Sequence, residues 1–362
     1  MKTLHLFQYG KGKIGEALLR QVVTRSDFLA DHYGIRLEYI GFCGQSRSII
    51  DLSGLNRWLE HNESRAGSLS DPVRGQPRPC SMALLELLLE RSIPDLCVID
   101  TTAAELVDVH RVCLRKGIPV ITANKKPLAV DYPIYQDLQH LGRGADLLYW
   151  YETTVGAGLP IISTIREMIA TGDTVTELTG CLSGTLGYIC SQLDVGGSFS
   201  DIVKQAKALG YTEPDPRDDL NGMDVARKAL ILAREIGYPL NLSDITVESM
   251  VSARLIQAPT VDAFMAELSA EDDRYQRLLA DCREGNEVLR YVVTIRQGAC
   301  EIGVRRVPKD SPTGSLGGPD NLVALTTKRY RSRPLVIRGP GAGADVTAAG
   351  LFGDLIKAAT AR

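Results

Sequence analysis

The hydrophobic positions of residues 1–150 form short continuous runs that alternate with stretches of helical spacing. The runs lie at 4–9, 37–43, 96–100, 119–121 and 147–151, and their lengths are typical of strands buried on both faces. Apolar residues recur at helical spacing in 17–23, 83–89 and 106–116. Strands and helices in this alternation predict an α/β fold built on a parallel sheet.

The order of elements changes in the second part of the chain. Helices are predicted at 161–170, 202–209, 225–236 and 261–282, and strands from 175 and at 288–296, 299–307, 321–327 and 335–337. A helix rich in Ala, Leu and Ile closes the chain, and 52–79 predicts a helix with a polar loop. The length of 362 residues is sufficient for two domains.

Composition narrows the function classes. A net charge of −3 and a pI near 6.0 give no reason to expect nucleic acid or an anionic membrane as a partner. Eight scattered cysteines without Cys-x-x-Cys spacing predict reduced, buried thiols. A first strand near Leu4 leaves no room for a signal peptide. We therefore expect a cytoplasmic protein. None of the five histidines falls in the motifs below, so proton transfer should involve lysine or carboxylate.

A glycine motif follows the first strand and opens the first helix. Its Gly-x-Gly-x-x-Gly pattern, in that context, predicts a dinucleotide site with the pyrophosphate at the helix N-terminus. The predicted cofactor-binding residues here are Gly10, Gly12, Lys13, Ile14 and Gly15, and the hydroxyls of Thr101 and Thr102 end another strand at the same crevice.

No carboxylate ends the second strand, where an NAD-selective fold usually holds the ribose hydroxyl. Arg47, with Ser46, can hold a 2′-phosphate instead, which favours NADP over NAD; the alternative is that Arg47 is simply solvated. Lys125 and Lys126 end the strand at 119–121 and are candidate proton donors, or else solvated lysines. The small-residue loop after Glu152 can hold a monovalent cation through backbone carbonyls, or is a tight turn.

The segment 211–228 concentrates the most chemistry. Four carboxylates lie among two prolines, which predicts a rigid loop: Glu213, Asp215, Asp218 and Asp219. After Gly222 the spacing becomes helical, and Asp224 and Lys228 lie four residues apart on one face. This arrangement is typical of an acid/base and amine-binding site, although an exposed salt bridge of little energetic value would show the same spacing.

These motifs, in this order, resemble those of the homoserine dehydrogenases over nearly the whole chain. Five blocks carry the resemblance: 122–125, 152–160, 180–188, 210–228 and 339–347. The resemblance implies an oxidoreductase that interconverts L-homoserine and L-aspartate 4-semialdehyde with NAD(P)(H), toward threonine and methionine. It implies a Rossmann-type domain at 1–150, completed by 338–362, and a second α/β domain at 151–337 for substrate binding and dimerisation.

The resemblance also implies residue roles. Lys125 and Lys228 would be catalytic, with Asp224 positioning Lys228, and Lys126 remains the alternative to Lys125. The implied substrate-binding residues are Glu213, Asp219, Tyr211, Thr212 and Gly184. Lys125 and Gly343 would also bind the cofactor. Glu152 and the carbonyls of Val155, Ala157 and Leu159 would bind Na⁺ or K⁺. We expect a homodimer. We expect neither a kinase domain nor a regulatory domain.

The chemistry of aldehyde reduction agrees with these roles. Negative charge grows on the carbonyl oxygen as hydride arrives, so a nearby ammonium stabilises it and can supply the proton. Two features differ from the family pattern: Lys11 and Lys13 stand where smaller or apolar residues are frequent, and Gly187 stands where asparagine is common. The competing interpretations are a related amino-acid or semialdehyde dehydrogenase, and a dinucleotide-binding regulator without turnover.

Overall fold

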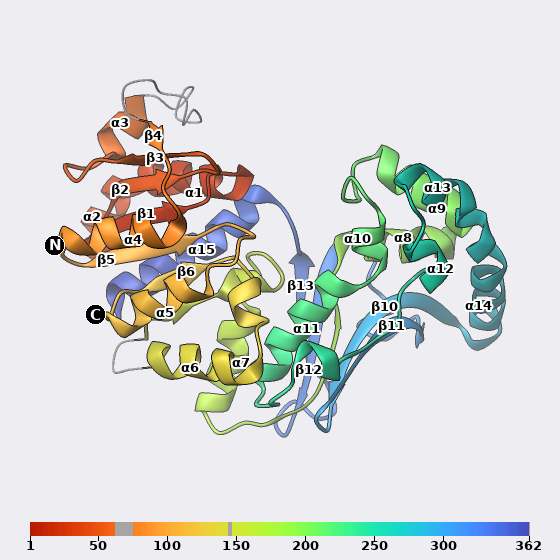
Figure 1. Ribbon diagram of the computed structural model, residues 1–362. Coiled ribbons are helices and arrows are strands. Elements are labelled where there is room, and N and C mark those ends of the chain that lie inside the picture. Colours follow the sequence, from red (N-terminus) through yellow and green to blue (C-terminus); the bar gives the residue numbers. More distant parts are fainter. Residues whose placement is uncertain (62–74, 144–146, 362) are drawn as a thin grey trace. The chain divides into compact units, whose positions relative to one another are not determined.

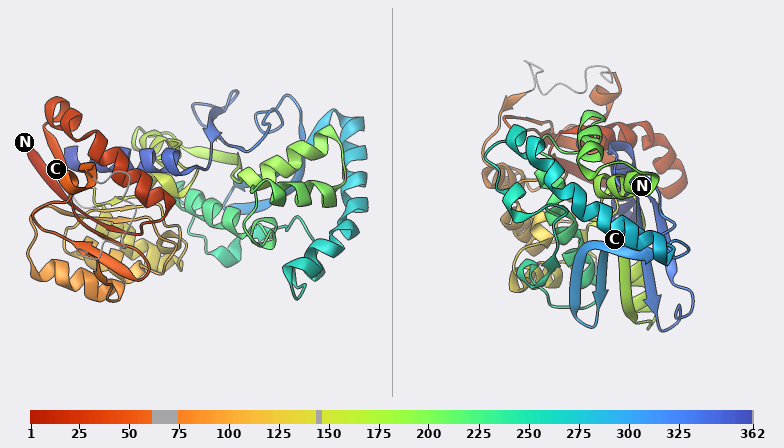
Figure 2. Two further views of the ribbon diagram at one scale, coloured as in Figure 1. Left: turned by 90° about the horizontal axis from the view of Figure 1, so that it is seen from above. Right: turned by 90° about the vertical axis from the view of Figure 1, so that its right-hand side faces the viewer.

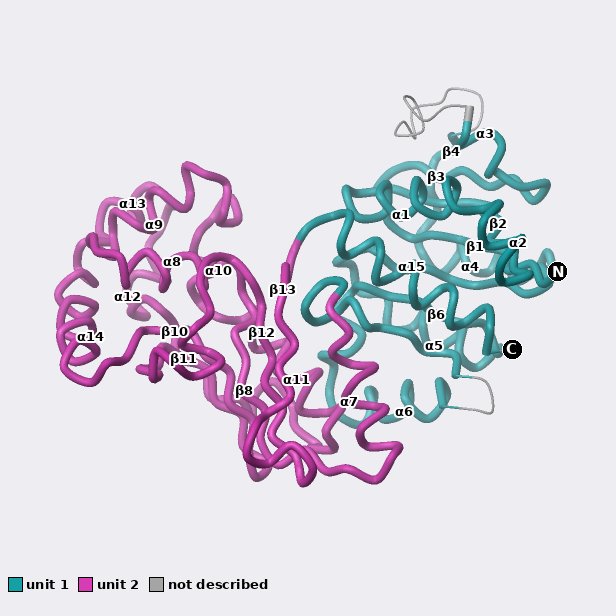
Figure 3. The backbone as a smooth tube through the Cα atoms, turned by 180° about the vertical axis from the view of Figure 1, so that it is seen from behind, with its two compact units in different colours: residues 1–158, 343–362 teal, residues 159–342 magenta. Residues whose placement is uncertain are grey.

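The computed structural model describes residues 1–61, 75–143 and 147–361 (Figure 1). The chain forms two compact units, each with its own sheet. Unit 1 comprises residues 1–158 and 343–362, and unit 2 comprises residues 159–342 (Figure 3). None of the helices in the described part of the chain combines the length and hydropathy that a bilayer span requires.

Unit 1 contains a seven-stranded sheet with the order β4-β3-β2-β1-β5-β6-β7. Its strands are β1 (Lys2–Tyr9), β2 (Ile35–Cys43), β3 (Arg47–Ile50), β4 (Gln76–Pro77), β5 (Leu96–Asp100), β6 (Val120–Thr122) and β7 (Tyr149–Trp150). β1 pairs in parallel with both β2 and β5, whereas β3 and β4 are antiparallel additions at one edge. The strand order reverses direction between β1 and β5, which is where doubly wound sheets bind ligands.

Helices cover the sheet of unit 1. They are α1 (Lys13–Thr24), α2 (Ser26–Tyr33), α3 (Asn56–His61), α4 (Ser81–Glu90), α5 (Val107–Arg115), α6 (Tyr132–Gly142) and α15 (Ala344–Thr360), with the short 3₁₀ helices η1 (Lys126–Leu128) and η2 (Glu152–Thr154). α15, the last helix of the chain, packs beside α1 (Figure 2). Leu18 of α1 and Leu351 of α15 are fully buried in one core with the strands, so the C-terminal helix belongs to this unit.

Unit 2 is built on a six-stranded sheet with the order β13-β12-β8-β10-β11-β9, antiparallel except for the pairing of β11 with β9. Its strands are β8 (Val175–Cys181), β9 (Thr246–Val247), β10 (Glu287–Arg296), β11 (Ala299–Pro308), β12 (Asp320–Thr327) and β13 (Leu335–Pro340). Its helices are α7 (Ile161–Ala170), α8 (Gly184–Val195), α9 (Phe199–Ala208), α10 (Arg217–Leu220), α11 (Met223–Glu235), α12 (Ala253–Ile256), α13 (Val261–Glu267) and α14 (Asp272–Gly285), with η3 (Leu242–Asp244) and η4 (Leu268–Glu271). α8 and α14 pack on β10, and α11 packs on β10 and β11.

The structure confirms the predicted α/β class, with a Rossmann-type sheet in unit 1 and a second α/β unit. The prediction of one helix at 261–282 is wrong, because α13, η4 and α14 divide this segment. Asp272 begins α14 and accepts hydrogen bonds from the backbone and hydroxyl of Ser200, so the chain bends where this carboxylate reaches α9. The sequence pattern also gave no sign of α2, β3 or β4.

A buried carboxylate fixes α15 against the loop at Glu152. Asp354 is 1% exposed, and its Oδ2 accepts a hydrogen bond of 3.0 Å from the backbone N–H of Glu152. Lys357 Nζ lies 3.3 Å from Asp354 Oδ1 and 3.9 Å from Glu152 Oε2. Burial raises the pKa of Asp354 to about 6, and the nearby Lys357 ammonium opposes that rise.

Asp354 predicts a pH dependence of stability. Its folded pKa of about 6 lies above the ordinary value of 3.8, so between these values the folded state retains a proton that the unfolded state releases. The free energy of unfolding should therefore fall as pH rises through this window and stay lower above it. Asp354→Asn should remove this fall and raise stability at pH 7 by about 2 kcal/mol. Urea midpoints from pH 4 to 7 measure this, with the exposed Asp345→Asn as the control. Parallel profiles for wild type and Asp354→Asn would contradict it.

Two glycines beside the acidic segment offer a matched test of packing. Gly222 and Gly210 both have left-handed backbone, with φ of +76° and +74°. A Cβ on Gly222 would lie 2.1 Å from Tyr291 Oη, whereas a Cβ on Gly210 would meet nothing within 4 Å. Gly210→Ala should cost about 1 kcal/mol of backbone strain, and Gly222→Ala about 2 kcal/mol more from the clash. Chemical denaturation compares them, and equal losses would show that Tyr291 moves aside freely.

Candidate functional site

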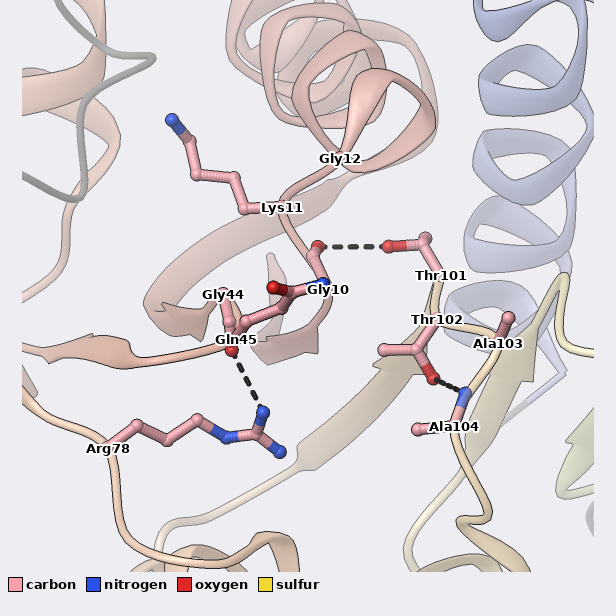
Figure 4. Close-up of a pocket in the computed structure, with 10 residues that line it drawn as sticks. All are labelled: Gly10, Lys11, Gly12, Gly44, Gln45, Arg78, Thr101, Thr102, Ala103 and Ala104. Carbon is pink, nitrogen blue, oxygen red and sulfur yellow. Dashed lines mark hydrogen bonds between the residues drawn. The ribbon is translucent and has the colours of Figure 1, made fainter. Parts of the chain in front are cut away.

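A cavity of about 590 Å³ opens at the carboxyl ends of β1, β2 and β5 in unit 1 (Figure 4). Its lining residues are Gly10, Lys11, Gly12, Gly44, Gln45, Arg78, Thr101, Thr102, Ala103 and Ala104. The cavity therefore lies at the switch point between β1 and β5, where a doubly wound fold binds its ligand.

Two glycines of the motif at this cavity, Gly10 and Gly15, leave no room for a side chain. Gly10 has φ of +96°, and a Cβ on Gly15 would lie 2.4 Å from Gly10 O. Thr101 Oγ1 donates to Gly10 O at 2.9 Å, and Gln8 Nε2 donates to the same oxygen at 2.8 Å. Gly12 begins α1 without a side-chain cap, which leaves the first backbone N–H groups of the helix for an anion such as a pyrophosphate.

The predicted cofactor residues separate into two groups. Gly10, Gly12, Thr101 and Thr102 line the cavity, whereas Lys13, Ile14 and Gly15 lie in the first turn of α1 and do not. Lys13 is exposed. Gly343 precedes α15 with φ of +124° and is not among the lining residues either.

The cationic side chains at this cavity differ from the predicted one. The Arg47 guanidinium donates to the Gly75 carbonyl, and Arg47 does not line the cavity. Lys11 and Arg78 do. Sequence reasoning missed Arg78 because it precedes α4 in a polar stretch without spacing that marks it, whereas Lys11 stood visibly between the first two glycines.

A buried carboxylate network supports the same edge of the sheet. Asp100 Oδ1 accepts hydrogen bonds from the backbone and hydroxyl of Thr102, at 2.9 and 2.7 Å. Asp100 Oδ2 lies 2.9 Å from Asn124 Nδ2 and 3.1 Å from His110 Nε2, and His110 Nδ1 lies 2.9 Å from Tyr149 Oη. Burial raises the pKa of Tyr149, and the Asp100 charge adds to that rise. Apart from Thr102 these side chains are buried, so the network is a fixed part of the unit.

Asn124 connects this network to the two candidate lysines. Its Nδ2 also donates to Ala104 O at 2.8 Å, and its Oδ1 accepts from Lys126 N at 3.1 Å. Lys126 Nζ forms an ion pair of 2.7 Å with Glu105. Lys125 precedes η1 and is half-buried. The structure therefore gives the two lysines different surroundings.

In unit 2, the start of α11 carries the Asp/Lys pair predicted from the sequence. Lys228 Nζ lies 2.9 Å from Asp224 Oδ2 and donates to Leu182 O at 2.8 Å. The side chains of Lys228 and Asp224 are 13% and 47% exposed. The pair is confirmed as an interaction, and the hydrogen bond to Leu182 O holds the ammonium beside the turn between β8 and α8.

Asp219 connects the acidic segment to α8. Its Oδ1 lies 3.0 Å from Thr185 Oγ1, which is also 2.6 Å from Tyr211 O, and its Oδ2 accepts from Glu213 N at 2.8 Å. Burial raises the pKa of Asp219, and the charges of Glu213 and Asp224 add to that rise against the hydrogen bonds. Asp219 therefore fixes the backbone on both sides of the prolines.

The other predicted substrate residues lie nearby. The rings of Tyr211 and Tyr188 lie 4.6 Å apart, and Thr212 Oγ1 donates to Glu213 O at 2.8 Å. A Cβ on Gly184 would lie 3.1 Å from Pro319 O.

The expectation that all four carboxylates of the segment lie on a loop is wrong for Asp218 and Asp219, which belong to the short helix α10. Pro216, with φ of −61°, precedes this helix, and Asp215 Oδ1 accepts from Arg217 N, so the prolines start a turn of helix here. The Arg217 guanidinium, hydrogen-bonded to Asp215, lowers the pKa of that carboxyl.

The predicted cation ligands span the boundary of the units. Glu152, Val155 and Ala157 are buried in unit 1, and Leu159 is the first residue of unit 2. Ala157 has φ of +54°. Within the described residues, no group of three or more His, Cys, Asp and Glu side chains can hold a metal ion. A site here would therefore depend on carbonyl oxygens with the single carboxylate of Glu152.

Lys125 lies in unit 1, and the Asp224–Lys228 pair lies in unit 2. Unit 1 therefore offers a cavity suited to a dinucleotide, and unit 2 offers a fixed ammonium beside several carboxylates.

Two curated relatives are similar to this chain. It is 40% identical over 365 residues to the chloroplastic bifunctional aspartokinase/homoserine dehydrogenase 2 of Zea mays, covering 99% of this chain and 39% of that protein. It is also 40% identical over 274 residues to the homoserine dehydrogenase of Emericella nidulans, covering 72% of this chain and 74% of that protein. The chain thus spans about two fifths of the bifunctional relatives it matches and about three quarters of the fungal one.

Solved structures share the fold. A Candida auris protein of unknown function is 32% identical, with a TM-score of 0.87 and 99% of each chain covered. A mutant of a hyperthermophilic archaeal homoserine dehydrogenase, solved in complex with NADPH, is 25% identical, with a TM-score of 0.73 and 98% and 97% of the two chains covered. The sequence model of the homoserine dehydrogenase family matches residues 160–356. This chain therefore belongs to the homoserine dehydrogenase family.

Proposed function

We propose that this chain interconverts L-homoserine and L-aspartate 4-semialdehyde with a nicotinamide dinucleotide. The observation that carries the proposal is the fixed Lys228 ammonium, held by Asp224 and by the Leu182 carbonyl in a family member whose acidic segment is intact. The cavity at the glycine loop supports dinucleotide binding, because its backbone leaves room for a pyrophosphate at the start of α1.

The nicotinamide cofactor, when bound, supplies or accepts the hydride. Lys228 would stabilise the negative charge that develops on the substrate oxygen and would donate the proton to it during aldehyde reduction. Asp224 would hold the ammonium in place. In the reverse direction Lys228 would receive the proton of the alcohol.

Lys125 is proposed as the second catalytic lysine. The ion pair of Lys126 with Glu105 supports this choice over Lys126, because it gives Lys126 a surface partner. The hydrogen bonds of Asn124 fix the backbone immediately before Lys125.

The acidic segment is proposed to recognise the amino acid part of the substrate. Glu213 and Asp219 would bind the α-ammonium group or its hydrogen-bond network, since carboxylates are its natural partners. Tyr211, Thr212 and Gly184 would line the substrate site. Thr185 and Asp219 hold this segment against α8, which supports a fixed recognition surface.

The cation site remains a proposal of the same kind. Glu152 with the carbonyls of Val155, Ala157 and Leu159 would hold Na⁺ or K⁺. Glu152 is buried, and Lys357 Nζ lies 3.9 Å from its Oε2, so a bound cation would share this carboxylate with the Lys357 ammonium. A homodimer and a cytoplasmic location stay predictions.

Lys228→Met tests the proposed chemistry. Loss of the ammonium should lower the rate of NADP-dependent homoserine oxidation by at least about 100-fold, because it removes a positioned proton carrier and its charge. Binding of NADPH, measured by its fluorescence, should not change, since Lys228 belongs to unit 2 and the glycine loop to unit 1.

Lys204→Met is the matched control, because Lys204 forms an exposed pair with Asp201 in the same unit. This variant should keep wild-type turnover. Wild-type protein that binds NADPH but oxidises no homoserine and reduces no aspartate semialdehyde would refute the proposed activity. An active Lys228→Met variant would refute only the role of the lysine.

A further inference from the structure

A buried ammonium without a hydrogen-bond partner lies at the glycine loop. Lys11 stands between Gly10 and Gly12, and its Nζ is buried and makes no hydrogen bond within the described part of the chain. The nitrogen lies 5.7 Å from the centre of the Phe42 ring. Burial lowers the pKa of Lys11, and the charge of Glu16 only opposes that effect. A desolvated cation of this kind calls for an anion, and the described residues do not provide one.

The position of Lys11 indicates which anion fits. Phe42 lies next to the last residue of β2, so the ammonium lies over the carboxyl end of that strand. Doubly wound folds recognise the ribose of the adenosine at this end, whereas the pyrophosphate lies at the N-terminus of α1. In Figure 4 the Lys11 side chain extends away from Thr101 and Thr102, and away from the labelled Gly44 and Gln45 as well.

Arg78 adds a second cation to the lining of the cavity, beside Gly44. Its guanidinium donates to Gly44 O at 2.9 Å and also to Ser81 Oγ, while its buried Nε has no partner in the described residues. No carboxylate is among the residues that line the cavity, and Gln45 stands just beyond β2. The carboxylate that would accept a ribose 2′-hydroxyl is thus replaced here by two cations.

We propose that Lys11 selects the 2′-phosphate of NADP(H) over the 2′-hydroxyl of NAD(H), with Arg78 completing the anion site. This inference rests on the proposed use of a dinucleotide and assigns the selectivity to a residue of the glycine loop. Arg47 has no part in it, because its guanidinium is bound to the Gly75 carbonyl outside the cavity. The 2′-phosphate would supply the hydrogen-bond acceptors that Lys11 Nζ lacks.

Binding measurements on the full chain test this without turnover. Titration calorimetry with 2′,5′-ADP and 5′-AMP, and fluorescence with NADPH and NADH, would compare wild type with Lys11→Met and Lys116→Met. Wild type should bind the ligands with a 2′-phosphate more tightly. Lys11→Met should weaken 2′,5′-ADP and NADPH by about 10- to 100-fold and leave 5′-AMP and NADH within about two-fold, as expected for a lost charge-assisted hydrogen bond.

Lys116→Met is the matched control, because Lys116 is an exposed lysine of unit 1 that does not line the cavity and should not affect either ligand class. Retained NADH binding shows that Lys11→Met is folded. Equal weakening of NADPH and NADH would overturn the inference in favour of a pyrophosphate contact, and so would unchanged NADPH binding. If wild type binds neither dinucleotide, the proposed function itself is wrong; if it binds both, only the selection by Lys11 is at stake.

Discussion

The buried carboxylate of Asp100 is the interaction on which the edge of unit 1 depends. It ends β5, and its two oxygens bind the Thr102 turn on one side and Asn124 and His110 on the other. Because Asp100, Asn124 and His110 are buried, each lost partner would leave a buried polar group unsatisfied. The turn that lines the cavity and the segment that carries Lys125 are therefore held by one group, and neither can shift without disturbing the other.

Unit 2 uses the same device with less burial. Asp219 holds the acidic segment by accepting from Glu213 N and Thr185 Oγ1, and Lys228 is fixed by one carboxylate and one carbonyl. Asp219 and Lys228 therefore each bind a backbone group in addition to a side chain. A surface salt bridge alone contributes little, so it is the additional carbonyl and hydroxyl contacts that distinguish this cluster from an ordinary helical ion pair.

Much of this arrangement follows from short-range sequence rules. The continuous run 96–100 was sufficient to predict β5, and the spacing of Asp224 and Lys228 was sufficient to predict their pair, because both depend only on strand or helix periodicity. Asp272 shows where such rules fail: its hydrogen bonds to Ser200 join residues 72 positions apart and divide a segment whose spacing is helical throughout. The turn of helix at Asp218 escapes these rules for a local reason: two prolines close together indicate a break, whereas Pro216 starts a helix here.

The cations of the cavity show the same limit at the site itself. Arg47 follows β2 in sequence, so proximity along the chain favoured it, yet the addition of β3 and β4 at the sheet edge brings its guanidinium to Gly75 and brings Arg78 to Gly44. An antiparallel extension with little hydrophobic periodicity thus decides which of the two arginines lines the cavity. Lys11 differs, because it stands between the first two glycines of a motif that the sequence already places between β1 and α1. The loop therefore sets the place of Lys11 at the cavity. That its Nζ has no hydrogen-bond partner among the described residues is visible only in the folded chain.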